Sequence, residues 1–154
     1  MGITIADFEG GLDEIIQTVL RQQKRPCLVA IHGAPDSGKT TLKLRAARAL
    51  EKRGMLGWAG KGEDAPEKIG KRTIKRPAYI LVEDLEYTAS TNLYTREVFG
   101  RTADLRVYIT DRLNLAELPP ALREDIKRGV YNLIVENQYA KRKGTLFAAS
   151  HSTL

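Results

Sequence analysis

Residues 33–41, which we call the glycine loop, have the composition and spacing of a segment that binds phosphate. Gly33-Ala-Pro-Asp-Ser-Gly38-Lys39-Thr40 fits the pattern G-x-x-x-x-G-K-[ST] without a gap. Glycines permit positive φ, so consecutive backbone N–H groups can turn toward one anion. In such a loop the lysine reaches the β- and γ-phosphates of a nucleoside triphosphate, and the threonine hydroxyl binds Mg²⁺. We therefore predict binding of Mg²⁺ and a nucleoside triphosphate.

The predicted nucleotide contacts all come from this loop. They are Gly33, Ala34, Pro35, Asp36, Ser37, Gly38, Lys39, Thr40 and Thr41. Asp36 is unusual, because a carboxylate beside a triphosphate costs Coulomb energy. Aspartate tolerates left-handed backbone better than most residues, so we expect a conformational reason for it. The chain has no Asn/Thr-Lys-x-Asp segment of the kind that indicates guanine specificity, which favours ATP over GTP.

A pair of acidic residues, Glu83 and Asp84, directly follows the apolar run 78–82. Phosphate-loop enzymes carry an acidic group at such a strand end, where it holds Mg²⁺ or polarises the acceptor. We predict catalytic roles for Lys39, Glu83 and Asp84, and metal binding by Thr40 and Glu83. The alternative is an ordinary acidic strand end. Side chains alternate along a strand, so only one of the two acids can face the site.

Basic residues in the segment 112–129 form a third candidate group. Arg123 and Lys127 are four residues apart and would share one face of a helix, and Arg128 follows directly. Arg123 and Arg128 could close over the phosphates as a lid and stabilise transferring charge. The alternative is a solvated basic face paired with neighbouring acidic residues.

The elements that must position these groups alternate between strands and helices. Continuous apolar runs of strand length predict buried strands at 27–32 and 78–82, and a third strand is predicted at 105–110, before Asp111. Shorter strands are predicted at 55–59 and 147–150, and helices at 12–22, 40–53, 93–100, 121–128 and over most of 130–142. Such alternation predicts an α/β fold of three α/β/α layers around a mostly parallel central sheet. Ligands bind beyond the carboxyl ends of such strands.

The bulk composition predicts one globular domain over residues 1–154. Hydrophobic residues make up 42% and charged residues 29% of the chain. No apolar run approaches the ~20 residues that span a bilayer, so we expect no membrane association. An acidic N-terminal segment has the wrong charge for a presequence, and the single cysteine, Cys27, excludes an internal disulfide. A reducing cytoplasm is the expected compartment.

The positive charge is concentrated around the glycine loop. Residues 21–76 carry fifteen basic and five acidic residues, a local net charge of +10. One interpretation is a solvated surface with the cations that any phosphate site needs. The other is a nucleic-acid surface, which is not favoured because aromatic residues are only 6% and no recognition module is visible.

Four segments together resemble the uridine kinase and phosphoribulokinase family of phosphate-loop kinases. They are 28–42, 79–85, 104–110 and 123–129. The resemblance implies the P-loop NTPase fold, phosphate and Mg²⁺ roles for Lys39 and Thr40, and a functional glutamate at Glu83. It also implies lid roles for Arg123 and Arg128.

The chain departs from this family where the catalytic base is expected. No Asp-Asp-Phe-Tyr-like motif lies between Gly54 and Pro77, and the candidates are Glu63, Asp64 and Asp84. The leading hypothesis is a kinase that moves the γ-phosphoryl group of ATP to a nucleoside- or sugar-like hydroxyl. The alternatives are a nucleotide-binding module without transfer activity, or a nucleic-acid-dependent NTPase or polynucleotide kinase. The sequence leaves open the acceptor and the oligomeric state, and a homo-oligomer is compatible with it.

Overall fold

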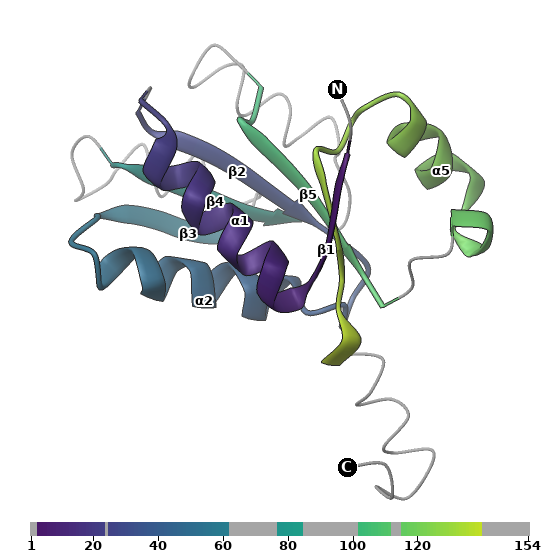
Figure 1. Cartoon of the computed structure of the whole chain (residues 1–154), viewed down its shortest axis with the longest axis horizontal. Coiled ribbons are helices and arrows are strands. Elements are labelled where there is room, and N and C mark those ends of the chain that lie inside the picture. The colour runs from purple at the N-terminus through teal and green to yellow at the C-terminus, as the bar shows by residue number, and fades with distance from the viewer. Residues whose placement is uncertain (1–2, 24, 62–76, 85–101, 112–114, 140–154) are drawn as a thin grey trace, which may run out of the picture.

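The structure is a computed structural model, which describes residues 3–23, 25–61, 77–84, 102–111 and 115–139. These residues form an α/β fold with one parallel sheet in the order β1-β6-β5-β2-β4-β3 (Figure 1). Its strands are β1 Thr4–Asp7, β2 Cys27–His32, β3 Gly57–Lys61, β4 Tyr79–Asp84, β5 Leu105–Thr110 and β6 Leu133–Glu136. The helices described with them are α1 Phe8–Arg21, α2 Lys39–Glu51, the 3-10 turn η2 Leu115–Glu117 and α5 Pro120–Lys127.

The strand β2 lies in the middle of the sheet, between β4 and β5. All six of its residues are buried, as its continuous apolar run predicts for a strand covered on both faces. Alternate residues enter two different cores. Val29 and Ile31 face the core that also contains α1 and α2, whereas Leu28 and Ala30 face the opposite side.

Helices cover both faces of the sheet. The helices α1 and α2 pack on one face, where their apolar residues join those of β2, β5 and β6. On the other face Leu122 and Ile126 of α5 pack near Tyr131 and Ile134. Figure 1 shows α1 and α2 together beside the sheet and α5 at the β5–β6 side.

The connections that leave β2 and β4 lead toward opposite edges of the sheet. From β2 it passes through α2 to the edge strand β3, and from β4 it continues to β5 on the other side of β2. In open α/β sheets a ligand binds in the crevice at such a switch point, beyond the carboxyl ends of the strands. The glycine loop follows β2 and Glu83 is the penultimate residue of β4, so both lie at this place.

The N-terminal helix begins at Phe8, four residues before the predicted start of 12–22, and a strand that was not predicted precedes it. Asp7 caps the helix, since its side chain accepts a hydrogen bond of 2.7 Å from the N–H of Gly10. Gly11 is needed for close packing: a Cβ atom there would lie 2.5 Å from Cγ2 of Val135. Gly10 and Gly11 therefore lie inside the helix, whereas the predicted helix 12–22 begins after them.

The prediction of a mostly helical segment over 130–142 was wrong. Residues 133–136 form β6, which pairs with β1 on one side and β5 on the other. Leu133, Ile134 and Val135 are each at most 1% exposed. Burial of this short β-branched run between two strands overrides the local helical pattern.

The remaining boundaries follow the predictions closely. The strands 27–32 and 105–110 have the predicted limits, and Gly54 ends the α2 segment with φ +79°. The strand β3 begins two residues later than predicted, and β4 runs on through Glu83 and Asp84. The predicted helix 93–100 and strand 147–150 lie outside the described residues. In the part of the chain that the structure describes, no helix is long and apolar enough to cross a membrane.

Candidate functional site

The glycine loop runs from the buried end of β2 into the first turn of α2, and its two glycines are sterically required. A Cβ atom on Gly33 would lie 2.5 Å from the backbone oxygen of Ile109. Gly38 has φ +100°, and a Cβ atom there would lie 2.2 Å from Nδ2 of Asn137. A side chain at either position would force the loop away from β5 or β6.

Asp36 adopts φ +64°, which is left-handed backbone, and its side chain is exposed. The predicted conformational reason for this residue is therefore confirmed. In the same loop, the N–H of Ser37 donates to the carbonyl oxygen of Ala34 at 3.2 Å, which closes a tight turn.

Lys39 is the first residue of α2, and its side chain lies back over the loop. Only 9% of the residue is exposed, and Nζ donates a hydrogen bond of 3.1 Å to the carbonyl oxygen of Ala34. The ammonium group is thus held beside the N-terminus of a 13-residue helix. Both features favour an anion at this place.

Thr40, Lys43 and Glu83 form a compact polar cluster where α2 passes the end of β4. The Thr40 hydroxyl lies 2.9 and 2.8 Å from the two carboxylate oxygens of Glu83. Lys43 Nζ forms an ion pair with Glu83 Oε1 at 2.5 Å. Lys43 is 5% and Glu83 4% exposed. The register of β4 beside β2 places Glu83 opposite Ile31, two residues before the glycine loop.

The environment of Glu83 keeps its carboxylate ionised. Burial alone would raise its pKa, but the hydrogen bonds from Lys43 and Thr40 and the charges of Lys43 and Lys39 outweigh it. The pKa of Glu83 is therefore below its usual range. A carboxylate with a lowered pKa is a weak proton acceptor, so Glu83 is suited to binding cations and hydroxyl groups rather than to removing a proton.

The donor set around Thr40 fits Mg²⁺ held jointly with phosphate. A hydroxyl and a carboxylate are oxygen ligands, and Mg²⁺ is commonly bound by one or two carboxylates plus substrate phosphates. No group of three or more His, Cys, Asp or Glu side chains within the described segments could hold a metal by itself. Thr40 and Glu83, the predicted metal ligands, are thus brought together, but the remaining ligands must come from elsewhere.

Asn137 is a structural part of the site that the sequence analysis missed. It follows β6, is 4% exposed, and donates from Nδ2 to the carbonyl oxygen of Ser37 at 2.8 Å. Its own N–H donates to Thr110 O, and its Oδ1 accepts from the N–H of Tyr139. The sequence analysis did not place Asn137 at the site because it predicted a helix over 130–142. Only a strand, β6, brings this part of the chain to the carboxyl edge of the sheet.

We expect Asn137→Ala to weaken nucleotide binding by about tenfold and to lower the free energy of unfolding by roughly 1–2 kcal/mol. The reason is that the buried carbonyl of Ser37 loses its donor and the loop loses its contact with β6. Calorimetric titration with ATP and urea unfolding measure the two effects. Asn132→Ala is the matched control, since Asn132 Oδ1 accepts from the N–H of Arg106 at 2.7 Å, away from the loop. Equal losses of nucleotide affinity in the two variants would contradict a role of Asn137 in positioning the glycine loop.

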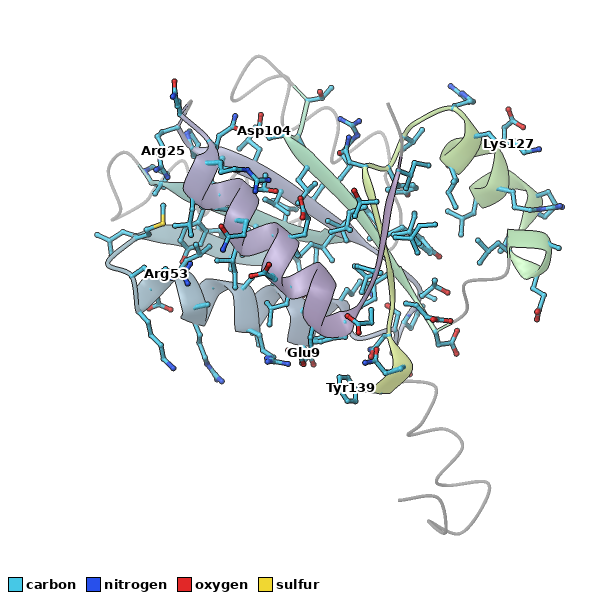
Figure 2. All side chains as sticks on the ribbon, viewed as in Figure 1. Glu9, Arg25, Arg53, Asp104, Lys127 and Tyr139 are labelled. Atoms are coloured by element: carbon cyan, nitrogen blue, oxygen red, sulfur yellow. The ribbon has the colours of Figure 1, made fainter. Side chains whose placement is uncertain are left out.

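Of the two predicted lid residues, Arg128 lies apart from this cluster. The α5 helix ends at the amino half of β5, where the Arg106 guanidinium donates to the carbonyls of Gly129 and Val130. Arg128 directly precedes these two residues and is exposed. Figure 2 shows Lys127, on the last turn of α5, at the upper right, and Tyr139, two residues after Asn137, at the bottom of the sheet. Arg123 is half-buried, and within the described residues its Nε finds no hydrogen-bond partner.

The other predicted residues are placed as follows. Ala34, Pro35, Asp36, Thr40 and Thr41 are exposed on the loop and the first turn of α2, whereas Gly33 and Ser37 are buried. Asp84 is the last residue of β4, and its side chain lies outside the described part of the structure. Glu63 and Asp64 are also outside it. The structure therefore brings the predicted residues Lys39, Thr40 and Glu83 together, and Lys43 belongs to the same cluster. The side chains of the three candidate bases lie outside the described residues.

Comparison of the chain with protein-family models, with curated proteins and with solved structures found no match.

Proposed function

We propose that this chain has the P-loop NTPase fold and binds a Mg²⁺–nucleoside triphosphate, ATP by preference, at the glycine loop. The observation that carries the proposal is the contact between the Thr40 hydroxyl and the Glu83 carboxylate beside Lys39. This contact joins the two residues that a phosphate-loop protein needs for its metal, and they come from different elements. Their position at the switch point of the sheet agrees with a ligand site.

The proposed reaction is transfer of the γ-phosphoryl group from ATP to a small hydroxylic acceptor of nucleoside or sugar type. Lys39 would orient the β- and γ-phosphates, and the N–H groups at the start of α2 would bind phosphate oxygens. Bound Mg²⁺ neutralises charge on the phosphate oxygens, and Thr40 and Glu83 would hold it. Positioning and charge stabilisation supply most of the rate in such transfers.

A second candidate function is nucleotide binding without transfer. It is favoured by the state of Glu83, whose carboxylate is engaged by Lys43 and Thr40 and whose pKa is lowered. Such a group does not serve as the base that accepts the hydroxyl proton of an acceptor. Under this proposal the chain would be a pseudokinase or a regulatory module that responds to bound nucleotide.

Thermal denaturation and calorimetry with a ligand panel test both candidates. The panel contains ATP and GTP, each with and without Mg²⁺, and then ATP with nucleosides and sugar phosphates. A ligand that binds only the folded state at one hundred times its Kd adds about 2.7 kcal/mol of stability. Stabilisation by ATP with acceptor-dependent ADP release would support the kinase, and stabilisation without release would support the module. If no nucleotide changed the melting temperature, both would be wrong.

A further inference from the structure

Lys43 is a buried lysine that the proposed nucleotide site does not by itself require. It stands one turn beyond Lys39 on α2, is 5% exposed, and its ammonium group contacts Glu83 Oε1. Lysine is rarely buried unless it is paired, because removing its charge from water is costly. The Lys43–Glu83 pair is therefore a defined feature of the site.

Lys43 makes the net charge of the buried groups at the site positive. The ammonium groups of Lys39 and Lys43 and the carboxylate of Glu83 are all at least about nine-tenths buried, and together they carry a net charge of +1. Such a site attracts a polyphosphate anion and repels a free divalent cation. Without Lys43 the same buried groups would be neutral overall, and no ammonium group would be in direct contact with the Glu83 carboxylate.

We infer that Lys43 is the resident counter-cation of Glu83 and makes the binding of a divalent metal depend on bound nucleotide. This inference rests on the proposed nucleotide site. Lys43 acts through Glu83 and is a positioning residue: it holds the carboxylate in place against Thr40 while no metal is bound. A bound triphosphate would supply the negative charge and the further oxygen ligands that Mg²⁺ needs beside Thr40 and Glu83.

The inference predicts two opposite effects of removing the Lys43 charge. Metal-free ATP should bind more weakly to Lys43→Met, because the Glu83 carboxylate then repels the phosphates. Mg²⁺ should restore binding more strongly than in the natural protein, because the metal replaces the lost cation. We expect the ratio of the ATP Kd in EDTA to the ATP Kd in Mg²⁺ to rise by about tenfold or more.

Calorimetric titration of the full chain with ATP, in EDTA and in excess Mg²⁺, measures this ratio. Titration with Mn²⁺ in the absence of nucleotide provides a readout independent of ATP. We expect no Mn²⁺ binding to the natural protein and measurable binding to Lys43→Met. Arg48→Met is the matched control, since Arg48 is an exposed cation on the same helix. The double variant Lys43→Met/Glu83→Gln removes both buried charges and should show a ratio no higher than that of the natural protein.

The outcomes separate this inference from the proposed function. If the natural protein does not bind ATP in either buffer, the nucleotide site itself is wrong. If ATP binds but the ratio in Lys43→Met equals that in Arg48→Met, the role of Lys43 is overturned. Should Lys43→Met not fold, Lys43→Gln, which removes the charge but keeps a polar group beside Glu83, takes its place: a ratio equal to that of Arg48→Met would contradict the inference, and a higher ratio would support it.

Discussion

Lys39→Ala is expected to lose nucleotide-dependent stabilisation and any phosphoryl transfer while it keeps its fold. The ammonium group is the cation that lies over the glycine loop, and loss of one such charge-stabilising group costs about 100-fold or more in rate. The helix that carries Lys39 is anchored elsewhere, since Leu42, Ala46 and Leu50 are 0% exposed. The one hydrogen bond to Ala34 O that is lost is worth about 1 kcal/mol of stability.

The measurement pairs a thermal melt with calorimetric titration by Mg²⁺–ATP. Lys52→Ala is the matched control, because Lys52 is an exposed lysine at the other end of the same helix. We expect the control to bind ATP like the natural protein and Lys39→Ala to melt close to it in the absence of nucleotide. Unchanged ATP binding or turnover in Lys39→Ala would remove the basis of the proposed function.

Glu83→Gln is expected to destabilise the fold by about 3 kcal/mol at neutral pH. Glutamine can still accept a hydrogen bond from Thr40, but the ammonium group of Lys43 is then left buried without a counter-charge. Removing one partner of a buried ion pair typically costs 3–5 kcal/mol. Combining Glu83→Gln with Lys43→Met removes both charges and should recover most of the loss. Urea unfolding of the four proteins in this double-mutant cycle gives the coupling between the two residues.

The exposed pair between Arg45 and Glu9 is the control for this cycle. Its side chains are 43% and 49% exposed, so Glu9→Gln should cost about 0–1 kcal/mol. A loss in Glu83→Gln no larger than in Glu9→Gln would show that the buried pair does not stabilise the fold.

The pH dependence of stability provides a second readout of the same pair. The pKa of Glu83 is lowered in the folded chain, so its contribution is present above the ordinary glutamate pKa of 4.5. It is lost as the pH falls through the lower folded-state pKa. The difference in unfolding free energy between the natural protein and Glu83→Gln should therefore be constant near neutral pH and shrink in acid. A difference that grew on acidification would have the wrong sign.

The local chemistry of the glycine loop could be predicted because it depends on residues close in sequence. The positive φ of Gly38 and Asp36, the buried β2 strand and the start of α2 near Lys39 follow from short-range pattern. The strand 105–110 could also be predicted locally, since its β-branched and aromatic residues Val107, Tyr108 and Ile109 are typical of strands.

Residues that depend on partners distant in sequence could not be predicted in this way. In the sequence Lys43 is an ordinary helix-forming lysine. Its role depends on β4, which places Glu83, forty residues later in the chain, beside it. Asn137 lies in a segment predicted to be mostly helical, and only the strand β6 brings it to Ser37, one hundred residues earlier. The strands β1 and β6 were missed because each is four residues long and is defined by its pairing across the sheet.

The sequence by itself determined the α/β class, the glycine loop and the identity of the groups that could bind phosphate. Only the tertiary structure decided which of them meet: Glu83 joins Thr40 and Lys43, whereas α5 carries Arg128 to the amino half of β5. The physical reason is that backbone conformation is set largely by neighbours along the chain. The partner of a buried charge is set by strand order and register, which arise from the packing of the whole sheet.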